Sequence, residues 1–302
     1  MRYAEFGLTT QIETDLAESA RFFSTARNPT SALPGGEAFP LGTYNGLINA
    51  LARSLNLQLD TVVSEVQHDA SGVTVATSQG EYRGSHVVVT VPLGVLQTGA
   101  LRFSPPLPAS KQAAIDRLGM GSLEKVILRY DSAFWPAPGS GNFLYISPNS
   151  GEFPLIVDYT AFAAGSPTVV ALYSGDYRRA IVTESDAAIA QRLARVMGEI
   201  AGIPAPAPIA AHVTRWKADP FAGGSYSYLA VGATPSDYSE LARPVGNRLL
   251  FAGEATSMNY NGYVHGAMLT GIREAERLLG REGQGVELLS GLVIALGCDE
   301  MA

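Results

Sequence analysis

Apolar residues recur at helical spacing in several stretches of the chain, and these stretches predict amphipathic helices. The clearest covers residues 185–201, where Ser185 is a good N-cap and one apolar stripe follows it. The same spacing predicts helices over residues 44–55, 110–118 and 263–279. We expect the apolar stripes of the helices at residues 44–55 and 185–201 to be buried in a core.

Short runs of apolar and β-branched residues between these helices predict strands. The run Val87–Val91 lacks alternation of polar and apolar residues, which is typical of a strand covered on both faces. It stops at Pro92, which cannot donate a hydrogen bond to a neighbouring strand. The other runs fall at residues 57–59, 61–67, 73–77, 81–83, 123–130, 143–146, 155–159, 169–173, 211–216 and 249–251.

The order of these elements predicts an α/β fold of mixed α+β character in two nested parts. One part covers residues 1–97 and is completed by residues 244–281. The second part has its own mixed sheet with flanking helices and is inserted over residues 98–243. Residues 282–302 read as a loosely attached tail.

Composition narrows the classes of function. Of the 302 residues, 46% are hydrophobic, which is enough for one or two sizeable cores. A net charge of −7 without any lysine- or arginine-rich run argues against a nucleic-acid partner. The single cysteine, Cys298, excludes an internal disulfide, and four histidines without ligand spacing give no metal site to expect.

The apolar stretches also argue against a membrane protein. The longest one in the tail, Gly291–Gly297, is too short to cross a bilayer. No charged-then-apolar secretion signal is recognisable at the N-terminus. We therefore expect a cytoplasmic protein.

The stretch around the last predicted strand is the most informative one for function. That strand, Leu249–Phe251, runs into Gly253 and Glu254, and a loop then leads to a helix that starts near Tyr263. A helix N-terminus offers free N–H groups and a partial positive charge, which suit an anion or an electron-rich ring edge. The stretch therefore presents a carboxylate, small residues and a helix start to a single ligand.

Three further segments occur with this stretch in a fixed order. They are Gly42–Leu47 (GTYNGL), Val87–Pro108, which contains PLGVL and FSPPLP, and Thr214–Tyr228 (TRWKADPFAGGSYSY). Over roughly residues 35–280, the chain resembles the flavin-containing amine oxidases. This family includes polyamine oxidases, monoamine oxidases and the catalytic domain of lysine-specific histone demethylases.

One feature departs from the family pattern. The family normally begins with a strand, a G-x-G-x-x-G turn and a helix that hold the FAD pyrophosphate, and this chain contains no G-x-G-x-x-G. The resemblance thus implies an incomplete Rossmann-like FAD-binding domain, residues 1–97 and 244–281, interrupted by a substrate-binding domain, residues 98–243. Three alternatives stay open: the chain is a fragment, its missing half is a separate polypeptide, or it has lost the cofactor.

The resemblance assigns chemistry to three side chains. Tyr226 and Tyr263 match two rings that form an aromatic cage before the flavin, where they align the amine and attract cations. Lys125 matches the lysine that holds a water near flavin N5, and burial among apolar neighbours would lower its pKa. Without the resemblance, the tyrosines read as half-buried packing residues and Lys125 as a surface lysine.

The resemblance also implies how FAD is held. Glu254 would bind its ribityl or ribose-phosphate part, the Val264 N–H would meet flavin O2, and Gly262 would allow close approach. Ser225 stands where monoamine oxidases carry the cysteine that bonds to the flavin, so FAD is expected to be non-covalent. The other matched positions are Val63 beside the adenine, Thr90, Val91 and Pro92 along the cofactor, Trp216 against the isoalloxazine ring, and Gly253 beside Glu254.

The leading hypothesis is an FAD-dependent amine oxidase of the polyamine oxidase type. It would oxidise a primary or secondary amine to an imine and reduce O2 to hydrogen peroxide, with no nucleic acid or membrane as partner. One alternative is a non-catalytic fragment or subunit that needs a partner chain, or another copy of itself, to cover the incomplete sheet. Another is a related flavin amino-acid oxidase or desaturase, although no arginine stands in an obvious place to bind a substrate carboxylate.

Overall fold

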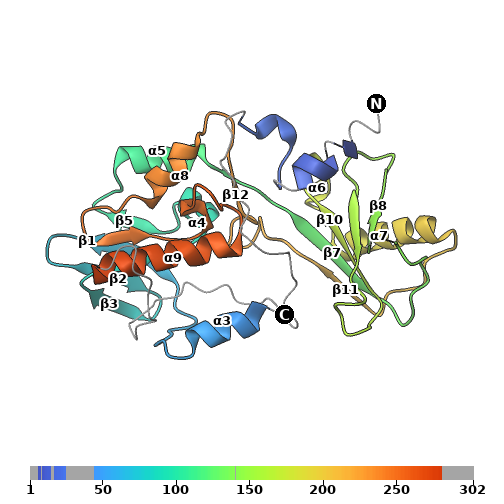
Figure 1. The fold of residues 1–302 in the computed structure, drawn as a ribbon, viewed down its shortest axis with the longest axis horizontal. Coiled ribbons are helices and arrows are strands. Elements are labelled where there is room, and N and C mark those ends of the chain that lie inside the picture. The colour runs from blue at the N-terminus through green and yellow to red at the C-terminus, as the bar shows by residue number, and fades with distance from the viewer. Residues whose placement is uncertain (1–5, 8, 15–16, 25–43, 140, 281–302) are drawn as a thin grey trace. The chain divides into compact units, whose positions relative to one another are not determined.

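The computed structural model describes residues 6–7, 9–14, 17–24, 44–139 and 141–280 (Figure 1). The chain divides into two compact units, which we call the first unit (Met1–Phe23 with Gly121–Ala218) and the second unit (Ser24–Met120 with Asp219–Ala302). The predicted tail at residues 282–302, including Cys298, lies outside the described residues, as do Gly42 and Thr43 of the Gly42–Leu47 segment.

A five-stranded antiparallel sheet forms the centre of the first unit, in the strand order β11-β7-β10-β9-β8. Its strands are β7 (Glu124–Arg129), β8 (Asn142–Leu144), β9 (Leu155–Asp158), β10 (Thr168–Tyr173) and β11 (Ala210–Val213). Helices α6 (Gly175–Ile181) and α7 (Asp186–Ala201) share one apolar core with the sheet, and the short helices η1 (Thr9–Glu13) and η2 (Ala20–Phe22) precede it in the chain.

Helix α7 forms as the sequence predicts. The Ser185 hydroxyl accepts a hydrogen bond from the Ala188 N–H at 3.2 Å, so Ser185 is the N-cap. Gly202 ends the helix in the left-handed conformation, with φ of 70°. Four residues of the predicted apolar stripe, Ile189, Leu193, Val196 and Met197, are fully buried in the core shared with the sheet, and the fifth, Ile200, is half-buried.

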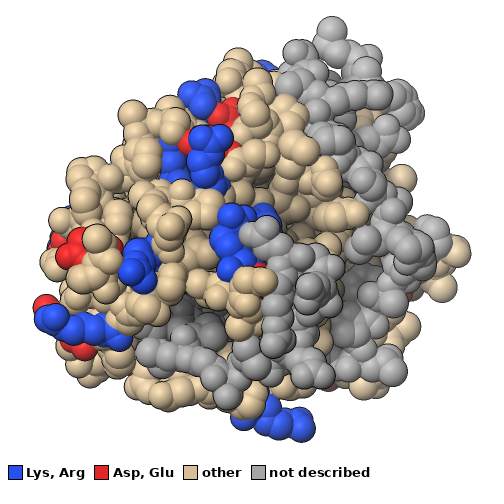
Figure 2. Space-filling model, turned by 60° about the vertical axis from the view of Figure 1, so that its left-hand side comes forward, with Lys and Arg blue, Asp and Glu red and all other residues tan. Residues whose placement is uncertain are grey.

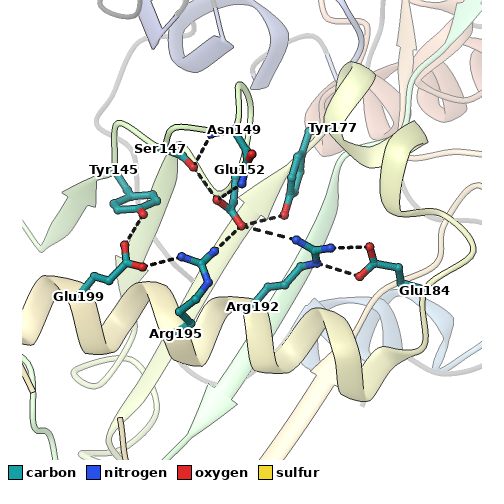
Figure 3. Close-up of polar contacts among 9 residues, drawn as sticks. All are labelled: Tyr145, Ser147, Asn149, Glu152, Tyr177, Glu184, Arg192, Arg195 and Glu199. Atoms are coloured by element: carbon teal, nitrogen blue, oxygen red, sulfur yellow. Dashed lines mark hydrogen bonds and ion pairs between the residues drawn. The ribbon is translucent and has the colours of Figure 1, made fainter. Parts of the chain in front are cut away.

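A buried carboxylate ties α7 to the loop between β8 and β9 (Figure 3). Glu152 is 1% exposed. It accepts hydrogen bonds from Ser147, Asn149, Tyr177 and Arg195 at 2.5, 3.1, 3.3 and 2.6 Å. Arg192 of α7 lies 4.0 Å from the same carboxylate, so two cations balance one buried negative charge.

Glu152→Ala is expected to destabilise the first unit by about 2 kcal/mol or more, because the buried donors lose their shared acceptor. The two arginine side chains are 36% and 46% exposed, so water compensates part of the loss. Urea unfolding followed by circular dichroism measures the change. Glu199→Ala is the control, since it removes a 48% exposed partner of Arg195 and should cost less than about 1 kcal/mol. Equal losses in the two variants would contradict this account.

Three small sheets occur among the described residues of the second unit. The largest has the order β3-β2-β1-β5 and contains β1 (Val63–His68), β2 (Val73–Thr77), β3 (Gly80–Gly84) and β5 (Arg102–Ser104). Strands β4 (Val87–Val89) and β13 (Leu249–Phe251) pair in parallel, and β6 (Gly119–Met120) and β12 (Ser227–Tyr228) pair antiparallel. The helices are α3 (Tyr44–Ala52), α4 (Leu93–Thr98), α5 (Ala109–Arg117), α8 (Pro235–Ala242), η3 (Glu254–Thr256) and α9 (Val264–Leu279).

The core of the second unit joins segments that the sequence analysis assigned to different domains. Ile115 of α5 and Leu241 of α8 are each 1% exposed and pack in the same cluster as Phe251 of β13. Residues 98–120 and 219–243 therefore belong structurally with the β13 segment, rather than with the inserted sheet. The functional division into an FAD-binding and a substrate-binding domain stays a prediction.

The helix predicted at residues 44–55 forms as α3, but the expected burial of its apolar face is wrong for the described residues. Leu47 and Ile48 are 47% and 55% exposed, and no residue of α3 is buried there. Periodicity indicates that a helix has an apolar face. It carries no information about which segment covers that face.

The predicted strand Val87–Val91 is shorter in the structure. β4 ends at Val89, which is buried, whereas Val87 and Val88 are half-buried. Among the described residues β4 pairs only with β13, so the expected cover on both faces is only partly found. A parallel pair of this kind normally belongs to a wider sheet. The strand predicted at residues 57–59 is irregular chain in the structure.

Candidate functional site

The predicted strand, loop and helix start are present in the second unit. β13 ends at Phe251, and α9 begins at Val264 with Tyr263 as its N-cap. Gly253 has a φ of 122°, which side chains rarely allow, so glycine is needed where the chain leaves the strand. The Gly253 N–H donates to the Thr270 hydroxyl of α9 at 2.9 Å, which holds the strand end against the helix.

Glu254 joins β12 to the loop that precedes α9. Its carboxylate accepts hydrogen bonds from the Ser227 N–H at 3.0 Å, the Ser227 hydroxyl at 2.7 Å and the Gly262 N–H at 2.6 Å. Burial raises the pKa of this carboxyl, and the hydrogen bonds oppose that change. Glu254 therefore fixes the local backbone, while its contact with the ribityl or ribose-phosphate part of FAD stays a prediction.

The two tyrosines expected to form the cage both lie beside this loop. Gly262 has a φ of 79°, and a Cβ atom there would lie 3.4 Å from the Tyr226 ring. Tyr263 follows directly, is 55% exposed and stacks on His265 with ring centroids 5.0 Å apart. The structure thus brings Tyr226, Gly262 and Tyr263 together at the start of α9. Their action as a cage around an amine stays a prediction.

The N-terminus of α9 offers an unused hydrogen-bond donor. Tyr263 makes no side-chain cap hydrogen bond to the helix. The Val264 N–H has no acceptor among the described residues, and Val264 is 56% exposed. A free N–H at the start of a 16-residue helix, with its partial positive charge, suits an electron-rich ring edge.

Several other predicted cofactor positions lie near the ends of the two parallel strands. Thr90, Val91 and Pro92 follow β4, and Gly253 follows β13. The Thr90 carbonyl oxygen would lie 3.9 Å from a Cβ atom at Gly253, so the two strand ends are adjacent. Ligands of open α/β sheets bind outside the carboxyl ends of parallel strands. Val63 is 8% exposed and begins β1 in the other, four-stranded sheet of this unit.

Lys125 and Trp216 belong to the first unit. Lys125 is half-buried on β7 opposite Leu172 of β10, and burial lowers its pKa against the opposing charge of Glu124. Trp216 is half-buried beyond the end of β11, and its backbone N–H donates to Glu124 at 3.0 Å. Since Tyr226 and Tyr263 belong to the second unit, a site shared by Lys125 and the tyrosines stays a prediction.

The sequence analysis missed the groups that hold these residues in place. Thr214 bonds to Glu124 across 90 positions of the chain, and Ser227 bonds to Glu254 across 27. Hydrogen bonds between residues so far apart produce no periodic pattern in the sequence. For Glu124 one signal exists, because an acid that lies two positions before the apolar run at residues 126–128 needs a specific set of partners if it is buried.

Two other features, a metal-binding cluster and a membrane-spanning helix, are not found among the described residues. No group of three or more His, Cys, Asp or Glu side chains in this part of the chain is placed to hold a metal ion. No helix there combines the length and apolar character that crossing a bilayer requires. On the face shown in Figure 2, basic side chains occur in separate groups, several of them next to acidic ones.

An α/β fold in which a strand leads through a partly buried carboxylate to a free helix N-terminus is typical of proteins that bind a nucleotide cofactor. The profile of the flavin containing amine oxidoreductases matches residues 3–279, and the chain belongs to this family. The predicted mixed α/β class is confirmed, and the family indicates FAD as the cofactor.

The relatives found by sequence include histone demethylase homologues from plants. Lysine-specific histone demethylase 1 homolog 1 of Oryza sativa subsp. japonica is 37% identical over 250 residues, covering 81% of this chain and 29% of the relative. Lysine-specific histone demethylase 1 homolog 2 of Arabidopsis thaliana is 39% identical over 250 residues, covering 81% of this chain and 33% of the relative. The chain thus spans only 29–33% of the length of these two relatives.

Two of the similar solved structures are named as oxidases of cyclohexylamine and of putrescine. Cyclohexylamine oxidase from Brevibacterium oxydans IH-35A has a TM-score of 0.59 and 26% identity, covering 69% of this chain and 46% of that protein. Putrescine oxidase bound to putrescine has a TM-score of 0.62 and 23% identity, covering 74% of this chain and 49% of that protein. The likeness to putrescine oxidase is one of fold.

Glu254→Ala should loosen the loop before α9, because Gly262 and Ser227 lose their common acceptor. We expect hydrogen exchange at the Gly262 amide to rise at least about tenfold and the free energy of unfolding to fall by about 1–3 kcal/mol. Exchange measured by mass spectrometry tests the first effect and urea unfolding the second. Glu81→Ala, at a 58% exposed residue, is the control and should leave both unchanged. Wild-type exchange at Gly262 in the Glu254 variant would refute the assigned role.

Proposed function

We propose that this chain carries the flavin-facing and substrate-facing parts of an FAD-dependent amine oxidase. The reaction is oxidation of a primary or secondary, polyamine-like amine to an imine, with O2 reduced to hydrogen peroxide. The amine loses two electrons and two protons, and O2 gains both. The observation that carries the proposal is the Val264 N–H at the start of α9, which has no acceptor among the described residues, in a chain of the flavin containing amine oxidoreductase family.

The residues of the second unit fit the flavin end of FAD. The Val264 N–H and the helix dipole would stabilise negative charge on the ring edge, and Glu254 and Gly253 would hold the sugar-phosphate side. Bound flavin supplies a two-electron acceptor. The sequence contains no G-x-G-x-x-G, so the residues present do not include the family's usual seat for the pyrophosphate. With serine at position 225, FAD is held without a covalent bond to that side chain.

Three matched residues would act on the substrate, namely two tyrosines of the second unit and one lysine of the first unit. Tyr226 and Tyr263 align the amine between their rings and favour a cationic or amine nitrogen there. Lys125, whose pKa is lowered by burial, holds a water that accepts a proton from the amine and later hydrolyses the imine. These roles follow the matched family positions, and the half-buried setting of Lys125 supports them.

A second proposal is that the chain acts only with a partner that completes the FAD-binding sheet. Two observations favour it. The parallel sheet of β4 and β13 has two strands among the described residues, whereas such sheets are normally wider and covered on both faces. Apolar side chains on two helices of the second unit are also exposed, namely Leu47 and Ile48 on α3 and Met268 and Leu269 on α9.

The particular amine is best approached by a panel of substrates. Two solved relatives of similar fold are named for cyclohexylamine and putrescine, and plant relatives are named lysine-specific histone demethylases. Spermine, putrescine, cyclohexylamine, leucine and a methylated-lysine peptide cover these classes in a peroxide assay. Turnover of leucine alone would favour the amino-acid oxidase alternative, and turnover of the peptide alone would replace the polyamine-like substrate.

Val264→Pro tests the flavin seat with little disturbance of the helix. Proline is tolerated at the first position of a helix, and Tyr263 already has the extended conformation, with ψ of 145°, that proline requires of its predecessor. We expect the loss of the N–H to weaken FAD binding about tenfold, measured by quenching of flavin fluorescence. Val264→Ala keeps the N–H and should bind as the wild type does. Equal affinities of the proline and alanine variants would remove this N–H from the site, and a wild-type chain that takes up no FAD would favour the partner proposal.

Lys125→Met should slow reduction or reoxidation of the bound flavin by about a hundredfold, because the ordered water and its proton path are lost. Stopped-flow absorbance of the flavin separates the two half-reactions. Arg129→Gln, on the same strand but exposed, is the control and should retain both rates. Unchanged rates in Lys125→Met would exclude Lys125 from the mechanism.

A further inference from the structure

Glu124 is a buried carboxylate at the start of β7, directly before Lys125. It is 2% exposed and lies in the first unit. Both of its oxygens are engaged, and no ion pair to Lys, Arg or His involves it among the described residues. This distinguishes it from Glu152, which is equally buried in the same unit but is balanced by two arginines.

Three of the four donors to Glu124 come from residues 214–217, the segment that carries Trp216. Its first oxygen accepts from the Ser122 hydroxyl at 2.8 Å and the Lys217 N–H at 3.3 Å. Its second oxygen accepts from the Thr214 hydroxyl at 2.7 Å and the Trp216 N–H at 3.0 Å. Two of the four donors are backbone N–H groups on either side of the Trp216 peptide unit. Hydrogen bonds to backbone are directional, so they set where this segment lies as well as satisfying the charge.

Thr214 connects the same carboxylate to the backbone of Lys125. The Thr214 hydroxyl accepts from the Lys125 N–H at 2.8 Å while it donates to Glu124. The Thr214 N–H donates to the Lys125 carbonyl oxygen at 3.0 Å. The strand pairing between β11 and β7 ends at Val213 and Val126. Beyond it, the side chains of Thr214 and Glu124 extend the contact between the two segments as far as the Trp216 N–H.

The segment around Trp216 borders a cavity. Arg215, Lys217 and Ala218 line this cavity of about 260 Å³ together with Glu124 and Tyr173. The Arg215 side chain anchors the segment through hydrogen bonds to Asp186 and to the carbonyl oxygens of Val182 and Glu184. Glu124 is the acceptor for the backbone N–H groups of Trp216 and Lys217, so it restrains the backbone itself. A buried charge is costly without such donors, so the arrangement is specific.

We propose that Glu124 is a positioning residue that fixes the backbone of Trp216 and Lys125 relative to each other. The inference rests on the proposed function, because it is in an amine oxidase that this spacing matters for the flavin and the water. It adds a residue that touches neither the amine nor the cofactor and acts through Thr214 and the Trp216 segment. A small displacement of such groups is enough to lower a rate by about a hundredfold.

The two tryptophans of the chain, Trp135 and Trp216, allow a direct test. Labelling with 5-fluorotryptophan gives two 19F resonances, which Trp216→Phe assigns. In Glu124→Gln we expect the Trp216 resonance to shift or broaden while that of Trp135 stays in place. Hydrogen exchange at the Trp216 and Lys217 amides should rise about tenfold or more, since each loses a buried acceptor.

Matched variants separate positioning from general loosening. Thr214→Val removes the bridging hydroxyl at nearly constant volume and should move the Trp216 resonance, whereas Thr214→Ser keeps the hydroxyl and should restore it. If Glu124→Gln does not fold, the Thr214→Val variant tests the proposal by itself. Glu152→Gln alters an equally buried carboxylate and should leave Trp216 and its amide exchange unchanged. An unmoved Trp216 resonance in both Glu124→Gln and Thr214→Val, or an equal effect in Glu152→Gln, would overturn the proposal.

The rate of flavin reduction tests whether the position set by Glu124 matters for the reaction. In the FAD-loaded protein, Glu124→Gln should lower the limiting reduction rate about tenfold with little change in KM for the amine. A displaced Trp216 with a wild-type reduction rate would overturn the link to the site. If the chain takes up no FAD or oxidises no amine, the proposed function fails, while the resonance and exchange measurements still decide whether Glu124 positions Trp216.

Discussion

In each of the two units, a carboxylate that accepts backbone hydrogen bonds holds predicted site residues in place. Glu254 receives N–H groups from Ser227 and Gly262, and Glu124 receives those of Trp216 and Lys217. Hydroxyl groups complete each set of donors, from Ser227 for Glu254 and from Ser122 and Thr214 for Glu124. These backbone N–H groups reach the carboxylate only in one backbone conformation. Each buried carboxylate therefore fixes the conformation of the residues that donate to it. The residues fixed in this way are those with proposed roles in amine oxidation.

Much of the fold follows from local signals in the sequence. Ser185 and the stripe after it define α7, and an apolar run followed by glycine defines β13 and the approach to α9. Helix α8 is not anticipated, although Thr234 and Asp237 form a capping box at its start, because its apolar stripe is weak. The grouping of α5 and α8 with β13 also cannot be predicted from the sequence, because a shared core depends on contacts between segments that are distant in the chain.

The motifs of the candidate site can be predicted from the sequence. The hydrogen-bond partners that hold these motifs in place cannot. Gly253, Glu254 and the helix start at Tyr263 stand where the sequence predicts, because strand, turn and helix are adjacent in the chain. Thr214 and Trp216, which bond to Glu124, and Ser227, which bonds to Glu254, lie far from these acids in the chain, and only the folded structure brings them together. The exposed stripe of α3 illustrates the same limit, since periodicity identifies an apolar face without identifying its cover.

The central claim is that a flavin seated at the start of α9 takes electrons from an amine. The most direct measurement is the absorbance of the FAD-loaded chain when a primary or secondary amine is added without oxygen. The account predicts that the flavin band is bleached and that it returns, with formation of hydrogen peroxide, when air is admitted. A loaded chain whose flavin band survives every amine of the panel would contradict the account.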